Sequence, residues 1–518
     1  MSFFEDLFKK KEEPIKNKTS SNYEKNVEEV KKILGESSDL SSREFEVGNT
    51  GLKGTVMFIE GLVNIDIINQ EILRNIMLFS RSVNSKKDLK NEIIEVIKNK
   101  TVTTAVIVEV EDIDKITSDL MNGIVAIFIE GQSKVLMVEA KSWPVRGIGE
   151  PSTETIIRGP SDGFVETLRF NTALIRRRIK DPTLRIQAMV LGKRSRTDVA
   201  VMYIEETVDK RVLKEVKERL DKINIDAILE SGYVEQFIED SSLSPFPQIQ
   251  STQRPDVVAA ALYDGRVAIG IDNTPFVLIV PATIVTFLQS PEDYNDRFIL
   301  TSFLRILRFA SFLGSIFLPS IYIAITAYHP DMLPSDLALY VAGSRMNVPF
   351  PPFIEIFIME IALELLREAG ERLPSSVGGI MGIVGGLVLG QAAVEAGIVS
   401  PLLVIVVALT AIASSVMPNY SISVGLRIFR FLVMILASML GLYGIVLGAI
   451  LILTHLCTLD SFGIAYLTPF VSTQGRGRDF KDSFVRMPLQ WMKKRSAYLK
   501  REDSTKLNIE DGGKHEGK

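Results

Sequence analysis

Hydrophobic and polar positions follow two different patterns along this chain of 518 residues. Before about residue 290, short β-branched runs alternate with polar turns and amphipathic helical stretches, which is typical of an α/β domain. Beyond Phe298 the apolar runs lengthen to about 20 residues, the length that crosses the hydrocarbon core of a bilayer. The pattern predicts a cytosolic α/β domain followed by an all-α polytopic transmembrane domain.

An internal repeat divides the α/β region. Residues 122–140 and 264–282 are identical at nine of nineteen positions, and each copy shows two apolar runs about a turn, the pattern of a β-hairpin. Upstream of each copy, the segments MFIE (57–60) and MYIE (202–205) end a predicted strand and lead into an amphipathic helix. We therefore expect two related α/β subdomains.

The distribution of charge supports a division of the chain into a region surrounded by water and a region surrounded by lipid. Residues 298–475 contain only 16 charged residues and no lysine, although the chain has 59 Lys and Arg and 63 Asp and Glu. The N-terminal residues mix acids and lysines without an apolar core and cleavage site, so we expect the soluble region to stay in the cytosol. The expected divisions are a polar N-terminal extension (1–42), α/β subdomain 1 (43–145), a basic helical connector (146–196), α/β subdomain 2 (197–290), a transmembrane helical domain (297–470) and a basic cytosolic tail (471–518).

The connector contains a basic helical pattern. Arg176, Arg177 and Arg178 form a continuous basic run within a stretch whose apolar residues recur at roughly helical spacing. Such a helix can lie on membrane lipid or contact another subunit. The alternative is a core helix whose arginines pair with acids of the neighbouring subdomain. The sequence leaves both interpretations open.

The transmembrane topology follows from charge at the ends of the apolar segments. The expected segments are residues 309–328, 351–366, 377–396, 399–418 and 431–454. Arginines before the first segment and the basic tail after the last both favour the cytosolic side, so the number of complete crossings should be even. The acidic second segment is the one expected not to cross, and this choice puts Arg427 and Arg430 outside.

Several polar residues interrupt the apolar segments. Glu355, Glu360 and Glu364 lie in the second segment, and Gln391 and Glu395 lie in the third. Carboxylates that face lipid are costly, so these groups should face the bundle interior, water or the interface. We take all five as candidates for lining or gating a pore.

Glycines recur at helical spacing in two of the segments. One face of a helix carries Gly378, Gly382, Gly386 and Gly390, and a second ladder is formed by Gly441, Gly444 and Gly448. Small residues on one face let helix backbones approach closely within a bilayer. The ladders predict tight helix packing and a homo-oligomer.

Catalytic and cofactor motifs are not found in the sequence. The soluble region has no Gly-rich phosphate loop, no Walker lysine motif and no nucleophile elbow. Three histidines and the single Cys457 offer no metal-ligand spacing, so we expect no enzyme, no metal and no cofactor. The soluble domain is not basic overall, which speaks against nucleic acid as a partner. We favour a protein-binding scaffold over a small-molecule cleft between the subdomains.

Several long motifs resemble a known family. They are GFVETLRFNTALIRRRIKDP (163–182), SPEDYNDRF (290–298), VPFPPFIEIFIMEIALELLREAG (348–370), GIVGGLVLGQAAVEAGIVSP (382–401) and VALTAIASSVMP (407–418). Together they closely resemble the A subunit of the GerA-type spore germinant receptors, and the likeness runs from about Arg43 to Phe470.

The resemblance implies a role in spore germination. It implies a place in the spore inner membrane, with a transporter-like B subunit and a lipoprotein C subunit as partners. It also implies an oligomeric channel that releases monovalent cations. A preference for cations would follow if Glu395 or Glu355 faces the pore, since a ring of carboxylates concentrates cations. The alternatives are an accessory A-like protein of the dipicolinic acid channel complex and a non-conducting membrane scaffold that clusters receptors.

Overall fold

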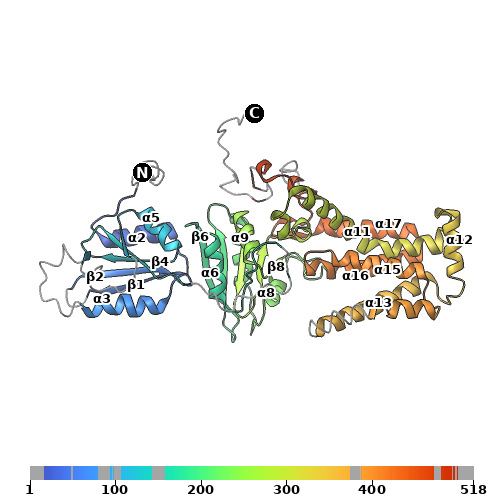
Figure 1. Ribbon diagram of the computed structural model, residues 1–518, viewed down its shortest axis with the longest axis horizontal. Coiled ribbons are helices and arrows are strands. Elements are labelled where there is room, and N and C mark those ends of the chain that lie inside the picture. Colours follow the sequence, from blue (N-terminus) through green and yellow to red (C-terminus); the bar gives the residue numbers. More distant parts are fainter. Residues whose placement is uncertain are drawn as a thin grey trace, which may run out of the picture.

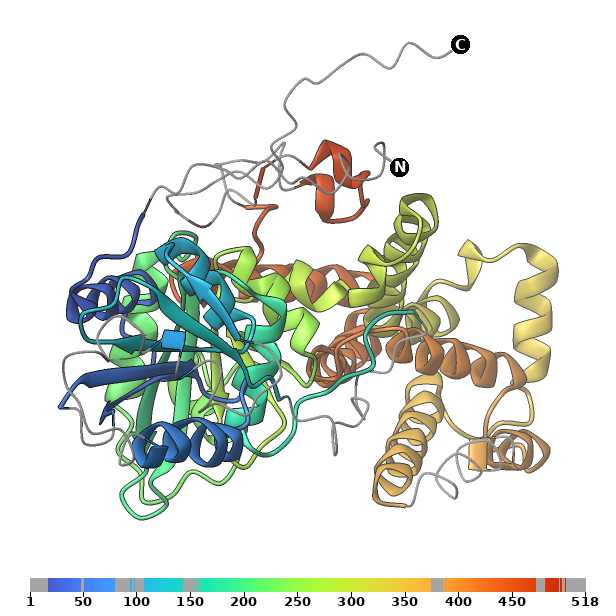
Figure 2. The same ribbon diagram turned by 60° about the vertical axis from the view of Figure 1, so that its left-hand side comes forward.

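The computed structural model describes residues 17–47, 51–79, 107–142, 158–373, 388–471 and 480–492, with isolated residues between these ranges. Three parts follow one another along the long axis: a first α/β lobe, a second α/β lobe and a helical bundle (Figure 1). The second view shows α12 at the end of the bundle remote from the lobes (Figure 2). We call the bundle end that faces the second lobe the near end and the opposite end the far end.

The first lobe is a five-stranded antiparallel sheet with helices on both faces. Its elements are α2 (Tyr23–Leu34), β1 (Leu40–Glu46), β2 (Lys53–Ile59), the π-helix η1 (Ile67–Leu73), α3 (Arg74–Phe79), β3 (Ile107–Val110), α5 (Ile113–Met121), β4 (Ile124–Ile129) and β5 (Val135–Glu139). The strand order is β1-β2-β4-β5-β3. Val56 of β2 packs toward η1 and α3, whereas the next residue, Met57, packs toward α2 and α5. Burial on both faces explains why these strands read as continuous apolar runs.

The second lobe repeats this architecture. It contains α6 (Leu168–Arg178), β6 (Leu184–Leu191), β7 (Thr197–Ile204), α7 (Lys210–Asp221), α8 (Ser231–Ile238), β8 (Gln250–Thr252), α9 (Pro255–Tyr263), β9 (Val267–Ile271), β10 (Val277–Val280) and α10 (Ile284–Leu288). Its strand order, β6-β7-β9-β10-β8, matches the first sheet position by position. Helices α7 and α8 cover one face and α6 and α9 the other. The predicted duplication is confirmed.

The lobes are larger than the predicted subdomains. The first lobe begins within the expected polar extension, because α2 packs on the sheet and β1 starts at Leu40. The expected connector contains α6 and β6, which are a covering helix and an edge strand of the second lobe. These elements are amphipathic, and their polar exposed faces made them look like separate segments.

A buried ion pair joins the two lobes. The Asp39 carboxylate, after α2, accepts hydrogen bonds from Arg176 Nε (2.7 Å) and Nη2 (3.1 Å), and both side chains are almost fully buried. Arg176 Nη2 also donates to Ser37 Oγ (2.8 Å). The prediction of a lipid or subunit contact is wrong for Arg176. The alternative, a core helix whose arginine pairs with an acid of the other lobe, is confirmed.

The other two arginines of the run pair within the second lobe. Arg178 donates to both oxygens of Asp162, at 2.9 and 2.6 Å, and is mostly buried. Arg177 approaches the same carboxylate at 3.7 Å and is partly exposed. The membrane or subunit contact stays a prediction for Arg177 alone.

The bundle follows a short 3-10 turn, η4 (Pro291–Tyr294). Its helices are α11 (Phe298–Tyr328), α12 (Ser335–Ser344), α13 (Pro352–Arg372), α15 (Pro401–Ser415), α16 (Tyr420–Leu440) and α17 (Leu442–Thr458), and residues 388–395 are also helical. After α17 come a hairpin of β11 (Asp460–Ser461) and β12 (Ile464–Ala465) and the turns η6 (Phe480–Asp482) and η7 (Leu489–Trp491). Helix α11 packs against α13, α15, α16 and α17.

The last predicted apolar segment, 431–454, is two helices and not one. Gly441 adopts a positive φ of 61°, which glycine reaches without steric cost, and the chain reverses there. Near this turn the Tyr328 hydroxyl, at the end of α11, donates to the Ser438 carbonyl. Helices α16 and α17 therefore form an antiparallel hairpin whose turn lies at the far end of the bundle.

Candidate functional site

A buried ion pair links three helices inside the bundle. Arg430 Nη1 of α16 donates to Glu360 Oε2 of α13 at 2.6 Å, and both side chains are buried. Arg430 Nε also donates to the Ser315 carbonyl of α11 at 2.7 Å. That carbonyl lies four residues before Pro319, which has no N–H to donate to it. Arg430 thus supplies the hydrogen bond that the proline removes, as expected for a proline within a membrane helix.

The other two predicted pore residues of α13, Glu355 and Glu364, are also paired. Glu355 is fully buried; its Oε1 accepts from Arg345 Nη2 (2.9 Å) and its Oε2 accepts from the Ser400 backbone N–H (3.1 Å). Glu364 is half-buried and pairs with Arg427 of α16. Each of the three glutamates predicted to line a pore from α13 therefore binds a cation of its own chain.

These pairs correct the expected position of the acidic helix. Because Glu360 and Glu364 bind Arg430 and Arg427, α13 lies beside α16 at the same depth of the bundle. Helix α16 starts at the near end, where Gly425 faces the Pro245 carbonyl of the second lobe. Arg427 lies in its first half and Arg430 at its midpoint, so neither lies at the end remote from the soluble domain, where the prediction put them.

Of the five predicted pore or gating residues, Gln391 and Glu395 are the exposed ones. Gln391 Nε2 donates to Glu395 Oε1 at 2.8 Å, so these side chains partner each other. The structure does not bring Gln391 and Glu395 together with the glutamates of α13 into one site.

The predicted glycine ladders have different surroundings. A Cβ on Gly444 would overlap the Leu436 carbonyl, and a Cβ on Gly448 would lie 3.1 Å from the Val433 side chain, so α17 packs closely on α16 at both positions. Gly441 forms the turn and is not part of this face. A Cβ on Gly390 would touch Val404 at 3.4 Å, whereas a Cβ on Gly386 would meet nothing within 4 Å. Gly378 and Gly382 lie outside the described residues.

A second buried ionic cluster lies at the near end, where α11 begins. Asp293 of η4 accepts from Arg305 Nε (2.9 Å) and from Arg308 Nη1 (2.8 Å), and Asp293 and Arg305 are almost completely buried. Arg305 Nη1 also donates to Asp482 Oδ1 (2.8 Å), and the Tyr294 hydroxyl donates to Asp482 Oδ2 (2.7 Å). Burial raises the pKa of Tyr294, so it stays a neutral donor. The cluster fixes the C-terminal segment against the start of α11.

The second lobe contacts the bundle through the loop after α8. The Phe246 ring stacks on Phe429 of α16 with centroids 4.8 Å apart. Ser244 Oγ and His455 Nε2 of α17 lie at hydrogen-bond distance, 2.9 Å. The lobe therefore touches α17 close to its near end and α16 at its middle.

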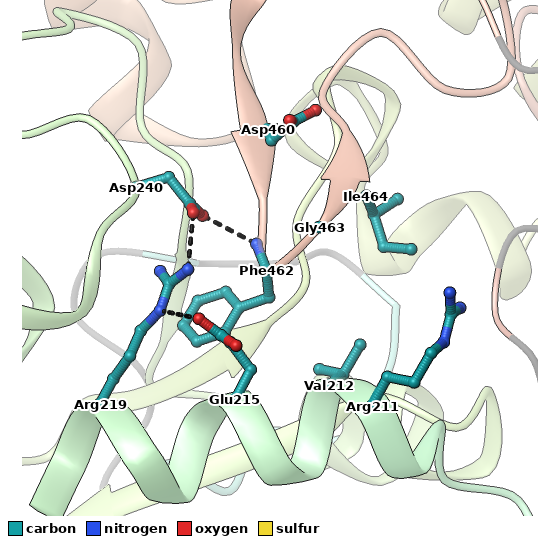
Figure 3. Close-up of a pocket in the computed structure, with 9 residues that line it drawn as sticks. All are labelled: Arg211, Val212, Glu215, Arg219, Asp240, Asp460, Phe462, Gly463 and Ile464. Atoms are coloured by element: carbon teal, nitrogen blue, oxygen red, sulfur yellow. Dashed lines mark hydrogen bonds and ion pairs between the residues drawn. The ribbon is translucent and has the colours of Figure 1, made fainter.

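The hairpin after α17 inserts into the second lobe. Phe462 is buried in the core beneath α7, and its backbone N–H donates to Asp240 Oδ2 at 2.8 Å. Arg219 of α7 stacks on the Phe462 ring (4.4 Å) and donates to Asp240 Oδ1 (2.6 Å). A cavity of about 360 Å³ lies between α7 and the hairpin, with Arg211 and Ile464 at one side (Figure 3).

The cavity has mixed charge and no metal site. Arg219 is held by Glu215 (2.9 Å) and Asp240, so this cation is already neutralised. Among the described residues, no group of three or more His, Cys, Asp or Glu is placed to hold a metal ion. Sequence reasoning missed this junction because its contacts join residues more than 200 positions apart, and only the β-hairpin pattern around Gly463 could have signalled it.

The fold and these contacts define a class of protein. A duplicated α/β domain is joined through its second lobe to an apolar helical bundle, in which α11 and α16 are long and apolar enough to cross a bilayer and α15 and α17 are shorter apolar helices. The sequence matches the family described as "Bacillus/Clostridium GerA spore germination protein" over residues 28–498. The chain belongs to this GerA family.

Known relatives agree with this membership. The chain is 43% identical over 497 residues to spore germination protein KA of Bacillus subtilis (strain 168), covering 96% of this chain and 90% of that protein. It is 41% identical over 488 residues to spore germination protein B1 of the same organism, covering 93% and 98%. It is also similar to the crystal structure of the N-terminal domain of the A subunit of the Bacillus megaterium spore germinant receptor GerK3, with 33% identity, a TM-score of 0.40 and coverage of 52% of this chain and 98% of that one.

Proposed function

We propose that this chain is the membrane subunit of a nutrient-sensing spore germinant receptor. Membership of the GerA family over nearly the whole chain carries this proposal. A-type subunits of this family work with B and C subunits, so the expected partners are a transporter-like B subunit and a lipoprotein C subunit. The expected location is the spore inner membrane, with both α/β lobes in the cytosol.

The bundle supports a topology of six crossings. Helices α11 and α16 run from the near to the far end, and α13, α15 and α17 return; the helix that contains residues 388–395 supplies the remaining outward crossing. The split at Gly441 thus gives the even number that the basic ends of the chain require. Arginines 305, 308 and 427 then lie in the cytosolic half, in agreement with the positive-inside rule, and Arg430 lies near the middle of the bundle.

An oligomeric channel requires that each copy of the chain has a free surface on which other copies can pack. The helical residues 388–395 expose Val388, Gln391 and Glu395, and Gly386 before them has open space at its Cβ position. Glycine faces suit close helix packing between copies within a bilayer. Glu395 repeated around an oligomer would form a carboxylate ring, which concentrates cations. The acids of α13 are neutralised in their own chain and serve to hold the bundle together.

Cation flux through the reconstituted receptor tests this proposal. We expect the purified complex of the three subunits to release potassium from loaded vesicles when it is opened by a germinant. Glu395→Gln should reduce the flux or its preference for cations, because the charge of the ring is lost. The control is Glu368→Gln, which removes an exposed glutamate of α13 that is paired with Arg372.

Two results would decide against parts of the proposal. Unchanged flux and selectivity in Glu395→Gln would remove this residue from the conducting path. No flux through the intact wild-type complex, with germinant bound, would favour the non-conducting scaffold over the channel.

A further inference from the structure

An exposed apolar surface lies on α8 and the loops beside it. Its members are Leu229, Tyr233, Phe237 and Leu243, whose exposed fractions are 65%, 41%, 52% and 95%. Tyr233 and Phe237 are four residues apart, so they share one face of α8. Val234 and Ile238, which lie about 100° around the helix from these two residues, are buried in the core of the second lobe. We call these four exposed residues the α8 surface.

The loop that presents Leu243 is fixed by hydrogen bonds. The buried Gln248 side chain accepts from the Ser241 N–H (2.9 Å) and donates to the Ser241 carbonyl (2.7 Å). The Ser244 N–H donates to the same carbonyl at 3.2 Å. The nearly complete exposure of Leu243 is therefore built into the loop.

This loop continues directly into the contact with the bundle. Ser244, the residue after Leu243, meets His455 of α17, and Phe246 stacks on Phe429 of α16. His455 is close to the near end of α17, whereas Phe429 is at the middle of α16. If the bundle spans the membrane as proposed, Ser244 lies where α17 leaves the bilayer, and Leu243 is its neighbour in the chain.

The face of α8 that carries Tyr233 and Phe237 has no charged residue within the helix. Gln236 is exposed beside this face, and Glu235 and Glu239 lie farther around the helix, beyond Gln236. A face with tyrosine, phenylalanine and leucine is typical of the boundary between headgroups and acyl chains. Glu235 and Glu239 are not attracted to anionic lipid. Binding to the membrane must therefore come from the burial of apolar side chains.

We propose that the α8 surface rests in the headgroup layer of the bilayer and gives the second lobe a membrane contact of its own. This inference rests on the membrane placement of the bundle in the proposed function. The partner of the α8 surface is the interface of the phospholipid bilayer, and the four side chains bind its apolar layer. Binding should therefore persist at high salt and in vesicles of zwitterionic lipid.

Quenching by lipid-borne nitroxides tests the contact. In a full-length Cys457→Ser background, single cysteines replace Leu243 or Phe237, carry an environment-sensitive fluorophore, and are reconstituted in phosphatidylcholine vesicles with nitroxide near the headgroup. We expect loss of emission and a blue shift at both sites. The soluble control is Val190→Cys, which is 52% exposed on β6, at the side of the second lobe near the first (Figure 1). It should keep its emission.

A membrane control separates the possible failures. Leu313→Cys, within the predicted apolar segment of α11, is 41% exposed and should be quenched. Quenching at Leu313 without quenching at Leu243 would overturn this inference and leave the proposed function intact. No quenching at Leu313 would overturn the membrane placement itself. Crosslinking of Leu243→Cys between copies, without lipid quenching, would show that the surface binds a second copy and would also overturn the inference.

Discussion

Removing one partner of the Glu360–Arg430 pair should destabilise the bundle more than removing both. Arg430→Leu leaves a buried glutamate without a cation and removes the donor of the Ser315 carbonyl. Glu360→Leu leaves a buried arginine unpaired. Removing one member of a buried pair costs about 3–5 kcal/mol of stability, whereas replacing both by apolar residues is often nearly neutral.

The loss of stability expected in the double variant follows from the contact with α11. With both residues changed to leucine, the charges are gone but the Ser315 carbonyl still has no donor, because Pro319 cannot supply one. An unsatisfied buried polar group costs about 1–3 kcal/mol. We expect the double variant to lose about that amount, well below the sum of the two single losses. Adding Pro319→Ala returns an N–H to the helix and should recover most of it.

Unfolding of the full-length chain in mild detergent, titrated with sodium dodecyl sulfate and followed by far-UV circular dichroism, measures these differences. The four chains of the Glu360 and Arg430 cycle are compared with the same four that carry Pro319→Ala. Additive losses in the double variant would refute coupling between the charges. A Pro319→Ala change that leaves the double variant unchanged would refute the assignment of the remaining loss to the Ser315 carbonyl.

Four other substitutions test separate parts of the chain. Asp39→Ala strands the buried Arg176 between the lobes and should cost about 3–5 kcal/mol, measured by urea unfolding. Burial and neighbouring acids raise the pKa of Glu235 to about 7, so stability should fall as pH rises from about 4.5 to about 7, and Glu235→Gln should raise the unfolding midpoint at pH 8 but not at pH 4. Gly444→Ala should destabilise the single chain in detergent, because its Cβ overlaps the backbone of α16, whereas Gly386→Leu should leave the single chain stable and weaken its oligomer, measured by light scattering.

The duplicated domain could be predicted from sequence because its signals are local. The repeat at 122–140 and 264–282 falls on β4–β5 and β9–β10, and both copies pair as antiparallel neighbours. Because the central strands are buried on both faces, they form continuous apolar runs that are visible in the sequence. The strands at the outer edges, such as β1 and β6, are half polar, and they were assigned to an extension and a connector.

The arrangement of the bundle could not be predicted, because it depends on pairs distant in sequence. Glu360 and Arg430 are 70 positions apart, and neither residue type reveals its partner. Treating α13 as an isolated acidic helix put Arg427 and Arg430 at the end of the bundle remote from the soluble domain, and the reversal at Gly441 looked like part of a packing ladder. Once the ion pairs are known, the buried acids have arginines as partners. The helical segments then also give the even number of crossings that we propose.

The junction at the near end determines how the soluble domain can act on the bundle. The second lobe holds the α16–α17 hairpin through Phe246 and Phe429, and the end of α17 through Phe462 buried beneath α7. The start of α11 is fixed by Asp293, which directly follows α10 and the last strands of the same lobe. A rotation of the second lobe would therefore displace α11, α16 and α17 together. Because Arg430 ties α16 to α11 and α13, such a displacement must either move the four helices as a body or break the buried pair with Glu360.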